Sequence, residues 1–203
     1  MTGYFIAFEG GEGVGKSTQE ALLAQYLTEI GKKVVRTREP GGTSAAEQIR
    51  DTVLSREHVG MNPQSEALLF AAARGDHVVR VIRPAMANGD VVICDRFIDS
   101  SIAYQGFARA LGAERVRDLS MWATGGLLPN LTIVLTLDPE ISMKRVVIPD
   151  RMEAEPMQYH RDVAAAFLEI VALDPDRYLV VDATGTKEDI AEIIRQRVMQ
   201  ELD

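Results

Sequence analysis

The chain has 203 residues, 46% of them hydrophobic and 26% charged, which is typical of one folded domain and excludes a disordered, collagen-like or disulfide-rich protein. The formal net charge of −8 argues against a nucleic-acid polymer as partner, but it allows a small anionic ligand, because a few placed cations outweigh the net charge locally. We expect no membrane span and no secretory signal, and the single cysteine, Cys94, fits the reducing cytoplasm.

Short apolar segments alternate with longer helical segments along the chain. Near-continuous apolar runs predict strands at 4–8, 33–37, 91–94, 131–137 and 178–181. Apolar residues at helical spacing predict helices at 17–30, 44–54, 64–87, 99–106, 113–123, 140–146 and 158–172, with a last one around 190–198. Strands that are apolar throughout favour a parallel sheet covered by helices on both faces, and ligands of such sheets bind at the carboxyl ends of the strands.

A glycine-rich segment follows the first predicted strand. Residues 10–17 fit the phosphate loop G-x-x-x-x-G-K-[ST] completely and lie between a strand and a helix, as that motif requires. Its backbone N–H groups would enclose a phosphate, while Lys16 would reach the β- and γ-phosphates and Ser17 would ligate Mg²⁺. The residues predicted to bind ATP are Gly10, Gly11, Glu12, Gly13, Val14, Gly15, Lys16, Ser17 and Thr18.

The phosphate loop alone does not separate a kinase from a hydrolase or a nucleotide-dependent switch. A GTPase switch would need an early D-x-x-G motif and a later N-K-x-D motif for guanine. The chain has D-x-x-G only at 182–185, near its end, and it has no N-K-x-D. A chance match at 182–185 is therefore the better interpretation.

Charged residues follow the third predicted strand directly. Asp95 could hold Mg²⁺ or its waters, and Arg96 could bind a phosphate of a second substrate; a structural ion pair is the alternative. Cys94, just before them, is interpreted as a packing residue.

Two further groups of residues share helix faces because they are spaced by four. Phe70 and Arg74 offer a ring to stack on a planar base and a guanidinium to bond its edge, although such residues more often serve the core and the surface. The pairs Ser100 with Tyr104 and Ser101 with Gln105 would form a polar and aromatic face on the next helix.

Four motifs in this order resemble those of bacterial thymidylate kinases: the phosphate loop, T-R-E-P-G-G-T at 37–43, D-R-F at 95–97 and A-Y-Q-G at 103–106. The resemblance implies a P-loop NTPase fold of class α/β, with three α/β/α layers, a five-stranded parallel sheet and a short lid. It also implies a homodimeric enzyme that converts ATP and dTMP to ADP and dTDP with Mg²⁺. The alternatives are another nucleoside monophosphate kinase or a non-enzymatic nucleotide-binding switch.

The resemblance further implies roles for individual residues. Phe70 would stack on thymine, Arg74 would hydrogen-bond its edge and Arg96 would bind the dTMP phosphate. Glu12 would approach the 3′-hydroxyl of the sugar, and Tyr104 would crowd its 2′ position. The residues predicted to bind the substrate are Glu12, Glu39, Phe70, Arg74, Arg96, Ser100, Tyr104 and, near the base, Gln105; the predicted metal ligands are Ser17 and Asp95.

Residues 146–156 are predicted to form a lid within the single domain 1–203. The lid is atypical of the resembled family, whose members without an arginine in the phosphate loop normally have a longer, basic lid; here the stretch 144–149 before D-R-x-E is short and mostly apolar. The phosphate loop has Gly13 and Val14 where some family members have an arginine, so an arginine from the lid would have to reach the transferring phosphoryl group. Arg151, in D-R-x-E at 150–153, is the first candidate and Arg145 the second; a solvated charge cluster at 150–153 is the alternative. The predicted catalytic residues are Lys16, Arg96 and Arg151.

Overall fold

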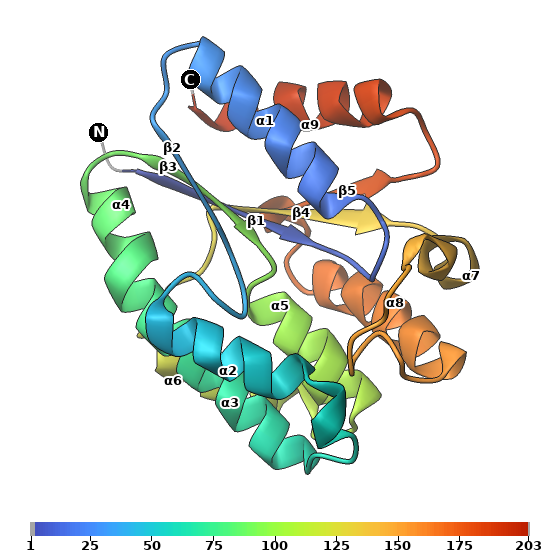
Figure 1. Ribbon diagram of the computed structural model, residues 1–203. Coiled ribbons are helices and arrows are strands. Elements are labelled where there is room, and N and C mark those ends of the chain that lie inside the picture. The colour runs from blue at the N-terminus through green and yellow to red at the C-terminus, as the bar shows by residue number, and fades with distance from the viewer. Residues whose placement is uncertain (1–2, 203) are drawn as a thin grey trace.

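The computed structural model describes residues 3–202, which form a sheet of five parallel strands in the order β2-β3-β1-β4-β5 (Figure 1). Each predicted strand is confirmed, with ends that differ from the prediction by no more than one residue. The strands are β1 (Tyr4–Glu9), β2 (Val34–Arg38), β3 (Val91–Asp95), β4 (Leu131–Thr136) and β5 (Tyr178–Asp182).

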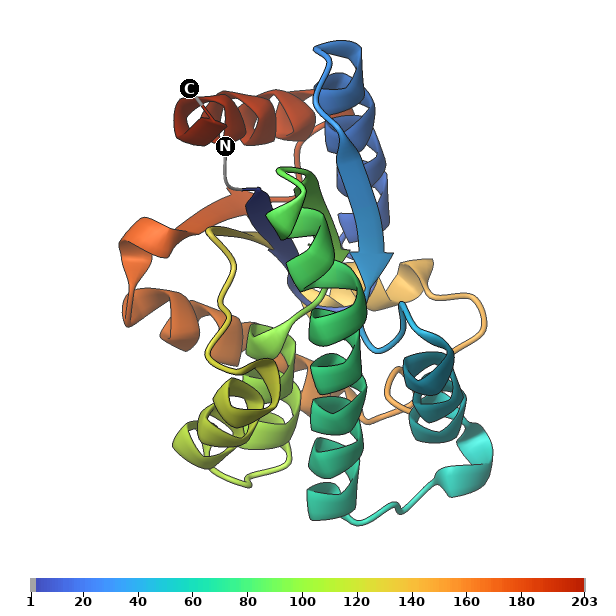
Figure 2. The same ribbon diagram turned by 90° about the vertical axis from the view of Figure 1, so that its left-hand side faces the viewer.

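Alternate side chains of the central strand β1 enter two separate apolar cores. Phe5 and Ala7 lie in one core and Ile6 and Phe8 in the other, all of them fully buried. Because both faces of the strand are apolar, helices must cover both faces of the sheet. Figures 1 and 2 show this three-layer arrangement, which confirms the predicted fold class. One face carries α1 (Lys16–Glu29) and α9 (Lys187–Leu202); the other carries α2 (Ser44–Leu54), α3 (Pro63–His77), α4 (Arg83–Ala87), α5 (Ile98–Ser101), α6 (Ala113–Thr124) and α8 (Met157–Ala172).

The helix predicted at 64–87 is continuous but contains a π-helical turn. A π-helical segment, Val78–Ile82, joins α3 to α4. Pro84 follows this segment, and it has no N–H for the carbonyl four residues earlier and crowds that carbonyl with its ring. A second π-helical segment, Ile102–Ala108, continues α5 and carries the predicted site residues Tyr104 and Gln105. Such segments are frequent at functional sites.

The helix predicted at 140–146 is short and ends at Arg145. It consists of α7 (Pro139–Ser142) and a 3₁₀ turn, Met143–Arg145. The segment 146–156, predicted to form a lid, follows as irregular backbone and turns, with Val147 and Ile148 almost fully exposed. Among the described residues, no helix combines the length and the apolar character needed to cross a bilayer.

The predicted motifs meet at one edge of the sheet. In the parallel register, Asp95 at the end of β3 pairs with Phe8 of β1 and with Arg38 of β2. The phosphate loop follows β1, residues 39–43 follow β2, and residues 96–97 follow β3. Segments far apart in sequence therefore converge where ligands of parallel sheets bind.

Candidate active site

After β1, the phosphate loop passes so close to neighbouring backbone that two of its positions have no room for a side chain. A Cβ atom on Gly10 would lie 2.3 Å from the carbonyl oxygen of Leu135, and one on Gly13 would lie 2.1 Å from that of Ser142. Both glycines also have positive φ angles, which L side chains rarely adopt. The backbone of β4 and α7 thus packs closely against the loop, and a side chain at position 13 would require this backbone to shift.

Lys16 begins α1, and its ammonium group points back into the phosphate loop. Its Nζ atom donates to the carbonyl oxygens of Gly11 at 2.7 Å and Gly10 at 3.2 Å. Burial, together with the nearby charge of Arg96, lowers the pKa of Lys16. A cation in this position faces the space in which such loops hold a phosphate.

An ion pair connects the phosphate loop to the turn after β3. Arg96 Nη2 lies 2.7 Å from Glu12 Oε1, and the Tyr104 hydroxyl donates to the same oxygen at 2.8 Å. Burial disfavours both charges. The charge of Arg96 nevertheless lowers the pKa of Glu12 to about 2, and the carboxylate of Glu12 raises the pKa of Arg96. Both groups are therefore ionised at neutral pH.

The buried carboxyl group of Glu9 holds the turn that presents Arg96. Arg96 has a φ of +68°, which is uncommon for a residue other than glycine. Glu9 Oε1 accepts the backbone N–H groups of Phe97 at 2.8 Å and Ser100 at 3.0 Å, and its Oε2 lies 2.5 Å from the Ser100 hydroxyl. Burial and the charge of Asp99 raise the pKa of Glu9 to about 7. Sequence reasoning missed Glu9, because its partners lie about 90 residues away in the chain.

Ser17 and Asp95, the predicted metal ligands, lie next to each other. The Ser17 hydroxyl donates to Asp95 Oδ2 at 3.4 Å, and Asp95 Oδ1 is buried with no hydrogen-bond partner among the described residues. Hydroxyl and carboxylate oxygens are the ligands that Mg²⁺ prefers, so this donor set fits the ion. Glu20, one turn further along α1, adds negative charge; burial and the charge of Asp95 raise the pKa of Glu20 to about 7.

A cavity of about 500 Å³ adjoins the phosphate loop and suits a nucleotide. It also borders Arg50, which sequence reasoning missed because only the packing of α2 turns that side chain inward. Of the other ATP-loop residues, Gly11 and Val14 line a second cavity on the opposite side of the loop. The main cavity brings together the predicted residues Glu12, Gly13, Gly15, Lys16, Ser17, Thr18, Glu39, Phe70, Arg74, Asp95, Arg96, Ser100, Tyr104 and Gln105.

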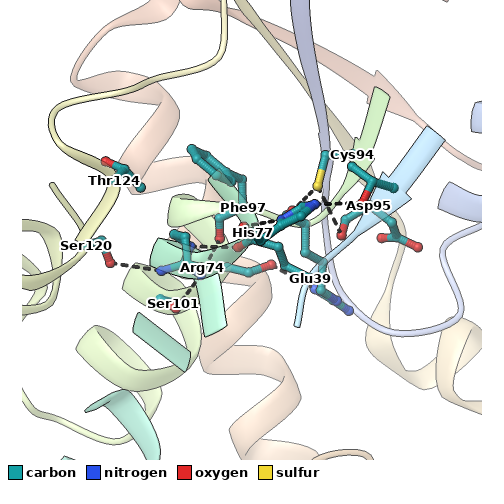
Figure 3. A network of polar contacts seen from close by, with 12 residues as sticks. Glu39, Arg74, His77, Cys94, Asp95, Phe97, Ser101, Ser120 and Thr124 are labelled. Carbon is teal, nitrogen blue, oxygen red and sulfur yellow. Dashed lines mark hydrogen bonds and ion pairs between the residues drawn. The ribbon is translucent and has the colours of Figure 1, made fainter. Parts of the chain in front are cut away.

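Arg74 reaches this cavity from α3 as part of a buried polar network (Figure 3). Its Nε donates to Glu39 Oε2 at 2.7 Å. Nη1 donates to the Ser120 hydroxyl at 3.0 Å, and Nη2 donates to the Phe97 carbonyl at 3.1 Å and the Ser101 hydroxyl at 2.9 Å. Within residues 3–202, four of the five N–H donors of this guanidinium are thus used, and the one that remains is on Nη1.

The structure does not bring Arg151 to the phosphate loop. Its Nη1 atom lies 2.7 Å from Glu66 Oε2, its Nε donates to the carbonyl of Val53 at 2.7 Å, and the side chain is 98% buried. Glu66 is fully buried and attracts a cation strongly, while the last carbonyls of α2 lack helical partners. Arg151 therefore anchors the segment 146–156 to α2 and α3, which corrects the expectation that this arginine lies at the phosphate loop.

Arg145, the second candidate, does lie at the phosphate loop. Its Nη1 atom donates to the carbonyl of Gly13 at 3.0 Å, and the side chain lines the main cavity. The D-R-x-E segment forms a turn of its own, in which Asp150 Oδ1 accepts the N–H groups of Met152 and Glu153. The alternative of a solvated cluster fits Asp150 and Glu153 but not the buried Arg151.

Comparison with known proteins agrees with this geometry. The sequence profile of the family described as thymidylate kinase matches residues 8–194. The chain belongs to the thymidylate kinase family. It is 52% identical over 202 residues to the thymidylate kinase of Clavibacter sepedonicus, with 97% of this chain and 95% of the relative covered. It is 42% identical over 207 residues to that of Bacillus licheniformis, with 100% and 98% covered.

A solved structure supports the same assignment. The crystal structure of thymidylate kinase from Ehrlichia chaffeensis matches with a TM-score of 0.79 and 33% identity, covering 100% of this chain and 99% of that one. The prediction of an ATP-dependent nucleoside monophosphate kinase of this family is therefore confirmed.

We predict that Arg151→Ala destabilises this kinase by about 1–3 kcal/mol, because the buried carboxylate of Glu66 loses its nearest partner but keeps Gln105 at 2.9 Å and Arg109 at 3.4 Å. Urea unfolding followed by circular dichroism measures the change. Arg161→Ala is the matched control, since Arg161 pairs with Glu140 on the surface and should change stability by less than about 0.5 kcal/mol. If Arg151→Ala is as stable as the wild type but has lost turnover, the arginine acts in catalysis and the prediction is wrong.

We predict that Glu9→Gln changes the pH dependence of stability. The folded-state pKa of about 7 lies above the ordinary value, so the contribution of Glu9 to stability is complete below about pH 4.5 and is lost as the pH rises through 7. The melting temperature of the wild type, relative to Glu9→Gln, should therefore fall by a few °C between pH 5 and pH 8, at about 2–4 °C per kcal/mol. Glu57→Gln, at an exposed position, serves as control. If the melting temperatures of Glu9→Gln and the wild type differ by the same amount at pH 5 and pH 8, the prediction is wrong.

Proposed function

We propose that this member of the thymidylate kinase family transfers the γ-phosphoryl group of ATP to dTMP, giving dTDP and ADP. The observation that carries the proposal is one cavity that joins the phosphate loop to a second set of nucleotide-binding groups. Phe70 offers a ring for the base, Arg74 a donor for its edge, and Arg96 a cation for a monophosphate. A nucleotide switch has no need of this second set.

At the base, Phe70 would stack on thymine while Arg74 donates to its 4-oxygen. The guanidinium of Arg74 is held on three sides and keeps one N–H on Nη1 for a ligand. A fixed donor at this edge favours the carbonyl group of thymine over the amino group of cytosine. Gln105, which donates to Glu66 at 2.9 Å, would form part of the adjoining wall.

At the sugar and phosphate, the Arg96–Glu12 pair would exchange partners. The dTMP phosphate would replace the carboxylate that Arg96 now faces, and Glu12 would turn to the 3′-hydroxyl. Tyr104 donates to Glu12, and its ring lies 5.1 Å from the centre of the Arg96 guanidinium. The same ring would crowd a 2′-hydroxyl and so favour the deoxyribonucleotide.

Catalysis would come from holding two phosphates in line and neutralising their charge, with little covalent chemistry by the protein. Lys16 would contact the β- and γ-phosphates. Ser17 and Asp95 would hold Mg²⁺, which neutralises charge on phosphate oxygens when bound. Because Arg151 is used to anchor the lid at 146–156, we assign the contact with the transferring phosphoryl group to Arg145, which directly precedes the lid.

We also infer that the kinase acts as a homodimer in the cytoplasm. Exposed apolar side chains support the first inference. Leu68 on α3 is 57% exposed, and Val79 in the π-helical segment after α3 is 64% exposed. Trp122 is 82% exposed on α6, which packs against α3. Sedimentation at micromolar concentration tests it. The unpaired, buried thiol of Cys94 agrees with a reducing compartment.

A substrate panel tests the proposed reaction. ADP release, measured with a coupled assay, is compared for dTMP, dUMP, UMP, CMP, AMP and GMP with ATP and Mg²⁺. We expect the highest kcat/KM with dTMP. A higher value with another monophosphate would identify a different nucleoside monophosphate kinase, and absence of turnover with all six would favour a nucleotide-binding switch.

We predict that Arg145→Ala lowers kcat by at least about a hundredfold with little change in the binding of ATP or dTMP, because cations of this kind contribute about 10³–10⁵ in rate in other P-loop enzymes. Single-turnover phosphoryl transfer measures the effect. Lys144→Ala, at the exposed neighbouring position, is the matched control and should transfer at nearly the wild-type rate. A loss below about threefold for Arg145→Ala would show that the phosphates are neutralised from elsewhere.

A further inference from the structure

The carboxylate of Glu39 is shared between two partners on α3. Its Oε2 atom accepts Arg74 Nε at 2.7 Å, and its Oε1 atom lies 3.0 Å from Nδ1 of His77 (Figure 3). The three side chains are 97–100% buried. Each oxygen of this carboxylate is held by one of these partners, so its orientation depends on both of them.

The contacts of His77 determine which ring nitrogen carries hydrogen. Glu39, paired with a guanidinium, can only accept, so Nδ1 of His77 is the protonated nitrogen. On the other side of the ring, Nε2 lies 2.6 Å from the hydroxyl of Thr37 in β2. The imidazole is therefore held at both nitrogens, and a chain of contacts runs from Thr37 through His77 and Glu39 to Arg74.

The backbone makes room for this imidazole at one position. A Cβ atom on Gly42 would lie 2.5 Å from Cδ2 of His77 and 2.8 Å from the hydroxyl of Thr37. Gly42 also has a φ of +86°. Three positions of the segment 37–43 thus contact or accommodate one histidine, although neither the motifs nor the predicted site included it.

We propose that His77 is a positioning residue, which holds Glu39 so that the single free N–H of Arg74 points at the base and thereby sets the preference for thymine over cytosine. The proposal rests on the proposed function of Arg74 as the base-edge donor. Arg74 is also bonded to Ser120, Phe97 and Ser101, but if the carboxylate at its Nε could rotate, the guanidinium plane would be free to tilt and its remaining donor would cover a range of directions. With Glu39 fixed by His77, only one direction is available, and it suits a carbonyl acceptor.

The test compares His77→Leu with His77→Asn. Leucine removes the donor to Glu39, whereas the amide nitrogen of asparagine lies where Nδ1 lies and keeps it. We expect His77→Leu to raise KM for dTMP about tenfold, to lower the ratio of kcat/KM for dTMP over dCMP about tenfold, and to leave KM for ATP within about twofold. His77→Asn should restore each value to within about threefold of wild type. The matched control is His58→Leu, at an exposed position on the short helical turn after α2, which should resemble wild type.

A double substitution tests whether His77 acts through Arg74. Arg74→Ala alone should raise KM for dTMP, and adding His77→Leu should change it by less than about twofold, because the pathway is already broken. Additive effects, an unchanged dTMP to dCMP ratio, or equal effects on both substrates would overturn the proposal. An unchanged KM for dTMP in Arg74→Ala would instead refute the base-edge assignment itself.

Thr37→Val covers the case in which His77→Leu does not fold. Valine keeps the shape of threonine but removes the hydroxyl that holds Nε2 of the imidazole. We expect about a threefold rise in KM for dTMP with kcat and KM for ATP retained. An unchanged KM for dTMP in a folded Thr37→Val enzyme would overturn the proposal.

Discussion

Two ion pairs beside the main cavity lie out of water, and each of their charges depends on a partner at a fixed distance. Arg74 with Glu39 and Arg151 with Glu66 are buried pairs, each closed at 2.7 Å. Compared with apolar residues of similar volume, such pairs contribute little to stability, but the loss of one partner costs several kcal/mol. Their main effect is to select one arrangement of the elements that carry them. The first orients the guanidinium proposed to meet the base, and the second ties the segment 146–156 to α2 and α3.

The degree of burial separates the fixed pairs from the one that a substrate can open. The side chains of Arg74 and Glu39 are each 3% exposed, whereas those of Arg96 and Glu12 are each 16% exposed and line the cavity. A phosphate could approach the latter pair, and Arg96 would then exchange one anion for another while Glu12 keeps the hydrogen bond from Tyr104. The strained turn at Arg96 is supported from beneath by the buried Glu9, so the cation stays in place while its partner changes.

The sequence predicted those features that depend on neighbouring residues in the chain. The apolar strands and the phosphate loop are local patterns, and both appear where they were expected. The role of Arg151 could not be read from D-R-x-E, because the carboxylate that binds it is 85 positions away. His77 was missed for the same reason, since its partners in and after β2 are about 40 positions away. Packing decides such long-range pairings, and a single sequence does not show them.

The segment 37–43 connects the sheet to α2 and α3, and this explains why it combines two threonines, a carboxylate and two glycines. Thr43 caps the first turn of α2 by accepting the N–H of Ala46, and it also donates to Asp76 at the end of α3 at 2.5 Å. The next residue of α3 is His77, whose imidazole lies against Gly42. One loop thus sets the positions of α2 and α3 relative to β2. Recognition of a planar base needs a stacking ring and an edge donor in fixed relation, and the two residues proposed for these roles, Phe70 and Arg74, both belong to the helix that this loop fastens to the sheet.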